Sequence, residues 1–132
     1  MMSGWRLLAL LTGWLLVLLV VYLSLTPQPP QPMTFDNSDK FEHALAYGAL
    51  SFWFGGIYRA PLQRLAAMTA LVGLGVGLEY VQGWTGYRTF DLLDMAADGF
   101  GVAAGWLLLC TPLGYLPHWI KRRAKNYLRN WN

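Results

Sequence analysis

Side chains that could transfer protons or bind metal gather in three short segments of this sequence, DKFEHALAY, EYVQ and RTFDLLDMAADGFG. We expect their polar residues to meet in one pocket: Asp39, Lys40, His43, Tyr47, Glu79, Gln82, Arg88, Asp91, Asp94 and Asp98. In the first segment, Lys40, His43 and Tyr47 have helical spacing and therefore share one face. An imidazole beside carboxylates is suited to acid–base chemistry or to holding a divalent metal.

The charges of these segments favour a functional pocket over a purely structural ion-pair network. With Glu42 included, they carry six carboxylates against the two cations Lys40 and Arg88, which leaves four uncompensated negative charges. Such an excess requires protonation, solvation, a bound cation or a cationic ligand. His43, Glu79 and Asp94 are the catalytic candidates, while the sequence leaves the metal and the cofactor open.

Four apolar stretches must position these residues, and we expect spans at about residues 5–25, 39–58, 65–84 and 91–111. A bilayer core requires about 20 residues of helix, which each stretch approaches or reaches. The first stretch carries no charge from Leu7 to Leu25, and we interpret it as an anchor rather than a cleaved signal peptide because it exceeds a usual signal core. Prolines at 27, 29, 30 and 32 predict an extended linker between the first two spans.

The composition supports a membrane protein. Of the 132 residues, 55% are hydrophobic and 13% are charged, whereas a soluble domain is about 25% charged. The sequence therefore predicts an all-α fold forming a single domain over residues 1–132: an integral membrane bundle of four transmembrane helices, plus a C-terminal basic amphipathic helix over residues 116–132. Cys110, the single cysteine, excludes an internal disulfide.

The charge distribution predicts the orientation of this bundle. With the N-terminus in the cytoplasm, the inner side holds eight of the ten basic residues: Arg6, Arg59, Arg64, Lys121, Arg122, Arg123, Lys125 and Arg129. All seven acids then fall on the outer side, which agrees with the positive-inside rule. We expect the basic tail to bind anionic lipid headgroups, and we expect no nucleic-acid partner.

Glycine pairs in the last two spans predict close helix packing. Gly73 and Gly77 form one GxxxG pattern, and Gly101 and Gly105 form another on the face that carries Asp94 and Asp98. Small residues at this spacing allow the backbones of two membrane helices to approach each other.

The ordered set of polar residues resembles the VanZ-like family of small membrane proteins. The family pattern D-K-x-x-H-x-x-x-Y, E-x-x-Q, Arg, Asp and Asn-x-x-Gly is similar to the residues from Asp39 to Gly101, with Asp98 in place of the usual asparagine. The resemblance implies a multi-pass protein of the bacterial inner membrane that affects sensitivity to the glycopeptide antibiotic teicoplanin or the handling of a cell-wall precursor.

Two alternatives follow from the residues themselves. One is a small membrane enzyme that acts on a lipid-linked envelope substrate by acid–base or metal-assisted chemistry. The other is a non-catalytic assembly subunit, in which the polar residues only hold the helices together. Enzymatic activity is therefore left open by the sequence.

Overall fold

The structure, a computed structural model, describes residues 4–115 together with residues 122, 123, 126 and 129. Its helices are α1 (Gly4–Leu25), α2 (Ser38–Ile57), α3 (Pro61–Thr85), α4 (Leu92–Leu109) and the short 3₁₀ helix η1 (Pro112–Tyr115). The described part of the chain is all-helical and contains no strand. The amphipathic helix expected over residues 116–132 lies almost wholly outside the described residues.

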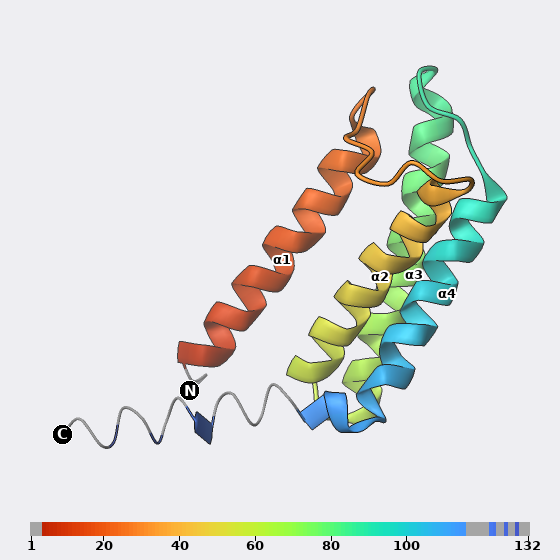
Figure 1. The fold of residues 1–132 in the computed structure, drawn as a ribbon. Helices are drawn as coiled ribbons and strands as arrows, with labels where there is room; N and C mark the ends of the chain where they lie inside the picture. Colours follow the sequence, from red (N-terminus) through yellow and green to blue (C-terminus); the bar gives the residue numbers. More distant parts are fainter. Residues whose placement is uncertain (1–3, 116–121, 124–125, 127–128, 130–132) are drawn as a thin grey trace.

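The four long helices alternate in direction, so that their ends form two opposite poles of the bundle (Figure 1). One pole, which we call the acidic pole, holds the end of α1, the start of α2, the end of α3 and the start of α4. The other holds the start of α1 and the connection between α2 and α3. All seven acids belong to the linker and helix ends of the acidic pole.

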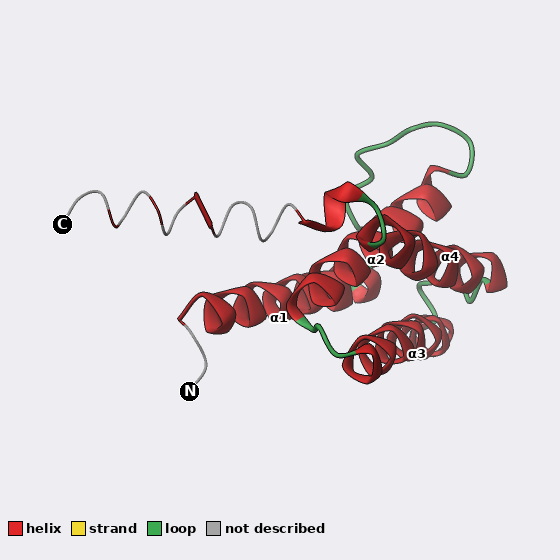
Figure 2. Cartoon of the chain, turned by 90° about the horizontal axis from the view of Figure 1, so that it is seen from below, coloured by secondary structure: helices red, strands yellow, loops and turns green. Residues whose placement is uncertain are grey.

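Helices α2 and α4 make the most extensive contact in the bundle (Figure 2). The backbones meet at glycine: a Cβ added to Gly101 would meet the carbonyl oxygen of Ala44, and one added to Gly105 would meet that of Gly48. The buried Ser51 hydroxyl then donates a hydrogen bond to the Val102 carbonyl at 2.7 Å. This contact holds the acidic ends of the two helices in register.

The other predicted glycine pair does not make such a contact within this chain. Gly73 and Gly77 are exposed on α3, and a Cβ added to either would have nothing within 4 Å. The inward face of α3 carries Met68, Leu71 and Gly75 instead. Close packing at Gly73 and Gly77 was therefore the wrong expectation for the described bundle.

Helix α3 begins four residues earlier than the predicted start at residue 65. Pro61 occupies its first turn, where the missing N–H costs nothing because that group has no intrahelical partner. Arg64 is consequently helical rather than part of a basic loop, and its Nε donates to the carbonyls of Gly55 at 2.9 Å and Tyr58 at 2.7 Å. It thus caps the last turn of α2, whose final carbonyls lack helical partners.

The apolar core is small compared with the apolar surface that remains exposed. Its fully buried members are Tyr47, Leu50, Phe54, Met68, Leu71 and Val102. Many large apolar side chains stay uncovered on the helices, including Trp14 on α1 and Leu107 on α4 at 58% and 68% exposure. Exposed apolar surface on this scale is typical of lipid-facing helices.

Three of the four long helices, α1, α3 and α4, are long and apolar enough to cross a membrane. Helix α2 has a similar length of 20 residues, but Asp39, Lys40 and Glu42 occupy its first two turns and shorten its uncharged stretch. The structure is consistent with a membrane protein and shows span-capable length and composition for those three helices.

Candidate functional site

Lys40 lies at the centre of the polar contacts on the acidic pole. Its ammonium donates hydrogen bonds to Asp91 Oδ2 and Asp94 Oδ1, both at 2.9 Å, and to Asp39 Oδ2 at 3.1 Å. The Lys40 ammonium lowers the pKa of the Asp91 carboxyl, which lies before the first residue of α4. One cation therefore joins the start of α2 to the start of α4 through three carboxylates.

His43 lies one turn further along α2 and faces the same part of α4. Its Nδ1 is 2.8 Å from Asp98 Oδ1, and its Nε2 is 3.8 Å from Asp94 Oδ2. Asp98 is buried, and the absence of a side chain at Gly75 of α3 makes room for it, since a Cβ there would lie 3.1 Å from the Asp98 Cβ. A carboxylate at this distance accepts a hydrogen bond from Nδ1–H, which leaves the lone pair of a neutral imidazole on Nε2.

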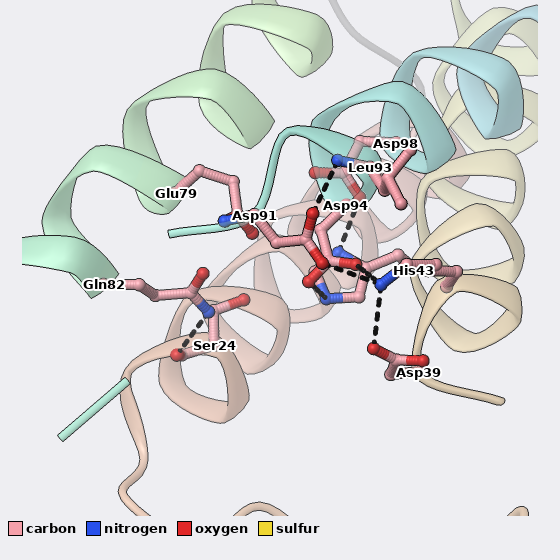
Figure 3. Close-up of polar contacts among 10 residues, drawn as sticks. Ser24, Asp39, His43, Glu79, Gln82, Asp91, Leu93, Asp94 and Asp98 are labelled. Atoms are coloured by element: carbon pink, nitrogen blue, oxygen red, sulfur yellow. Dashed lines mark hydrogen bonds and ion pairs between the residues drawn. The ribbon is translucent and has the colours of Figure 1, made fainter. Parts of the chain in front are cut away.

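Glu79 completes the group from α3 and is only 1% exposed. Figure 3 shows it reaching toward the start of α4, where its Oε2 accepts a hydrogen bond of 3.0 Å from the Asp91 N–H. Free N–H groups and the positive end of the helix dipole stabilise an anion at a helix N-terminus. None of the described residues makes an ion pair with Glu79.

The structure thus brings together eight of the ten expected residues. Seven supply charged or ionisable contacts at the acidic pole, and Tyr47 is buried one turn beyond His43 on α2. We define the acidic-pole cluster as these seven: Asp39, Lys40, His43, Glu79, Asp91, Asp94 and Asp98, with Tyr47 as its floor.

Gln82 and Arg88 lie apart from the acidic-pole cluster, contrary to expectation. Gln82 is buried against α1, where its Nε2 donates to the Ser24 carbonyl at 2.8 Å (Figure 3). Arg88 lies in the loop between α3 and α4 and makes no ion pair with any described acid. The Asp94 carboxylate is held by Lys40 instead.

The arrangement offers a metal-binding geometry that the sequence left open. His43, Glu79 and Asp94 come from three different helices, and one potential ligand atom from each lies within 4.8 Å of the other two. The same three groups can also bind and deprotonate a water or a hydroxyl group, since an imidazole and a carboxylate are the usual general bases of enzymes.

Sequence reasoning missed two residues that position the site. Gly75, which accommodates Asp98, lies four residues before Glu79, and this helical spacing on the same face was the available signal. Ser24 contributes only its main-chain carbonyl to Gln82, and no side-chain pattern could have indicated that contact.

Comparisons with known proteins give one informative match. No protein-family model matches the chain, and no solved structure matches it. The chain is 35% identical over 98 residues to the uncharacterized protein C11E3.10 of Schizosaccharomyces pombe. The matched region covers 70% of this chain and 58% of that protein, so the chain spans little more than half the length of this relative.

These findings overturn the resemblance to the VanZ-like family. No family model supports it, and a relative from fission yeast, a eukaryote, points away from a bacterial family. The expected bacterial inner membrane, the link to glycopeptide resistance and the cell-wall precursor lose their basis with it. The polar segments that suggested the resemblance supply the acidic-pole cluster, and the geometry of that cluster indicates what chemistry it can perform.

Proposed function

We propose that this chain is a four-span membrane enzyme whose acidic-pole cluster activates a water or hydroxyl group for reaction with a lipid-linked polar substrate. One observation carries the proposal: His43, Glu79 and Asp94 converge from three helices, with their ligand atoms within 4.8 Å of one another. Keeping a histidine and two carboxylates so close costs stability, and such groups are typical of functional sites in membrane proteins.

The four-span arrangement is supported by the alternating helix directions and by the exposed apolar side chains on every long helix. In this arrangement α2 crosses beside α4, and its charged first turns lie at the level of the lipid headgroups. Arg6, Arg59 and Arg64 lie at the pole opposite the cluster. The positive-inside rule then places both ends of the chain in the cytoplasm and the cluster on the other side.

Each member of the cluster has a distinct part in the proposed reaction. Asp98 accepts a hydrogen bond from His43 Nδ1–H and fixes the ring so that Nε2 points toward Asp94. Glu79 is a buried base whose Oε2 is already held by the Asp91 N–H, so that Oε1 is available to a water or hydroxyl group. Lys40 keeps Asp91 and Asp94 in position from the solvent side.

The substrate class follows from the position of the cluster. It lies where the helices meet the headgroup region, and the core below it consists of apolar residues such as Leu50 and Phe54. A substrate anchored by its acyl or prenyl chain would slide along the exposed apolar helices and bring its polar linkage to this level. Hydrolysis or transfer at that linkage requires an activated oxygen nucleophile, which the three residues are placed to supply.

The test is turnover by purified protein in lipid nanodiscs. The nanodiscs would contain the common glycerophospholipids and a polyprenyl diphosphate lipid, and mass spectrometry would follow the lipids and released headgroups. We expect loss of one lipid and appearance of its product with the wild-type chain, and a reduction of at least 100-fold with Glu79→Gln. Asp36→Asn is the matched control, since it also removes one negative charge from the same pole but lies in the linker.

Absence of turnover in folded wild-type protein, or equal turnover in Glu79→Gln, would refute the enzymatic proposal. The ion pairs of Lys40 favour the second candidate function, a non-catalytic subunit in which the cluster only fixes helix packing. In that case Glu79→Gln would lower the abundance of the protein or its thermal stability without changing any reaction.

A further inference from the structure

We propose that His43, Glu79 and Asp94 bind one divalent transition-metal ion of the Zn²⁺ or Mn²⁺ type. Only the role of the ion rests on the proposed function: it would lower the pKa of the attacking water. Binding itself is argued from geometry and can be measured without any substrate.

The distances are close to those of a formed site. Bonds from zinc to nitrogen or oxygen are about 2.0–2.2 Å long, so two ligands of one ion lie at most about 4.3 Å apart. His43 Nε2 and Asp94 Oδ2 already satisfy this limit at 3.8 Å, and the three ligand atoms lie within 4.8 Å. A side-chain adjustment of about half an ångström would complete the set.

Asp98 gives His43 the environment of a metal-binding histidine. Such histidines almost always donate their second ring N–H to a carboxylate or a carbonyl, which fixes the ring and makes the ligating nitrogen more basic. The Asp98 carboxylate lies 2.8 Å from Nδ1 and is only 2% exposed. Nε2 is therefore directed away from Asp98 and toward the space between Asp94 and Glu79.

Glu79 keeps one carboxylate oxygen free for a ligand. The hydrogen bond that Glu79 makes with the described residues uses Oε2, which leaves Oε1 for a ligand. Tyr47, which is 2% exposed and lies one turn beyond His43 on α2, makes no side-chain hydrogen bond with the described residues. No completely buried side-chain oxygen or nitrogen of the described residues lacks a partner, so the case for an ion rests on the converging ligand atoms and not on orphaned groups.

The charge of the cluster favours a cation in the same place. Asp94 uses Oδ1 to accept from Lys40, so its Oδ2 remains free to face His43. The five carboxylates of the cluster have one ammonium among them, and a neutral His43 adds no positive charge. A divalent ion would compensate two of the remaining negative charges without disturbing the contacts of Lys40.

The donor set indicates which ions would be accepted. Mg²⁺ and Ca²⁺ prefer oxygen ligands alone, whereas an imidazole with carboxylates suits zinc, iron and manganese. Three protein ligands leave a coordination position for water, as in catalytic zinc sites. With an ion held there, Glu79 would act as a ligand instead of a base, and the ion would supply the activation of water that the proposed function otherwise assigns to Glu79.

The experiment is isothermal titration calorimetry of the full chain in detergent micelles, after treatment with EDTA and removal of the chelator. Zn²⁺ and Mn²⁺ are the probes, with Mg²⁺ as the comparison ion. We expect one transition-metal ion per chain, and Co²⁺ should give visible absorption bands typical of a nitrogen- and oxygen-ligated ion of low coordination number. His43→Asn keeps a donor for Asp98 but lacks Nε2, and we expect it to weaken Zn²⁺ binding at least tenfold.

Two further variants sharpen the test. Asp98→Asn should weaken Zn²⁺ binding by about 10- to 100-fold, as loss of an orienting partner does. Glu42→Gln removes a carboxylate of the same helix end, whose Oε1 accepts from the Met33 N–H outside the cluster, and it should bind Zn²⁺ like the wild type. Thermal unfolding without metal must match the wild type for each variant that is compared.

The outcomes separate the metal site from the function. A folded wild-type chain that binds no Zn²⁺, Mn²⁺ or Co²⁺ would overturn the metal site, and so would unchanged binding in both His43→Asn and Glu79→Gln. Zn²⁺ binding without turnover of any lipid would support the site and refute the enzymatic function. Turnover that persists in EDTA would support the function and refute the metal.

Discussion

The glycine contact between α2 and α4 predicts a large difference between two otherwise identical substitutions. In Gly101→Ala, the new Cβ would lie 2.9 Å from Ala44 Cα and closer still to the Ala44 carbonyl oxygen. Non-bonded carbon atoms prefer about 3.5–4.0 Å, so the helices must separate by at least about 0.6 Å. Because the opposing atoms are main chain, they cannot rotate away.

The energetic cost follows from this overlap. Inserting a methyl group into a tightly packed contact costs about 1–3 kcal/mol, and replacing helical glycine by alanine returns about 0.5–1 kcal/mol. The midpoints of these ranges give a net destabilisation of about 1 kcal/mol, and their extremes give at most about 2.5 kcal/mol. Gly77→Ala makes the same chemical change where nothing lies within 4 Å, so it should leave stability unchanged or raise it slightly.

Thermal unfolding in detergent micelles, followed by tryptophan fluorescence, measures the difference. A loss of this size lowers the melting temperature of a chain of this length by several degrees. The separation should also weaken Zn²⁺ binding, since His43 and Asp94 lie on the two helices that part. Equal melting temperatures for Gly101→Ala and Gly77→Ala would refute the close approach of α2 and α4.

Two further predictions concern the cations that join helix ends. Lys40→Met leaves three carboxylates without their shared partner, and we expect a loss of about 1–3 kcal/mol in the free energy of unfolding, measured by denaturant titration. An unchanged free energy of unfolding would mean that solvation of the carboxylates fully replaces these ion pairs. Arg64→Met removes the cap on the Gly55 and Tyr58 carbonyls and should cost about 1–2 kcal/mol in the same assay. Arg88→Met is the control, because it breaks no ion pair with a described acid and should leave the free energy of unfolding unchanged. Similar losses for the two arginine variants would contradict the cap.

The sequence predicted the long helices because their signals are local. Apolar stretches between charged or proline-rich segments located the four long helices to within a few residues. The largest error, at the start of α3, arose because proline was interpreted as a loop residue although it is well suited to the first turn of a helix. The accompanying cap by Arg64 depends on how the chain folds back and has no local signal.

The membership of the site was harder to predict, because spacing gives a shared face but not the direction of that face. Gly73 and Gly77 have the expected pattern, yet the inward face of α3 is the one with Gly75 and Glu79. Glu79 itself was the signal for the correct face, because an ionisable residue in an apolar helix is expected to point toward the other helices. Gln82 was assigned to the pocket for its polarity, and only tertiary structure could show that its partner is a main-chain carbonyl of α1.

The packing of the helices divides the candidate site into a fixed and an adjustable half. Lys40, His43, Asp94 and Asp98 lie on α2 and α4, which are held together by direct main-chain contact at Gly101 and Gly105. Glu79 is carried by α3, which makes far less extensive contact with that pair. A small tilt of α3 would therefore move one carboxylate relative to an otherwise rigid frame. The distance of Glu79 from His43 and Asp94 would then determine the affinity for a bound group and the rate at which that group dissociates.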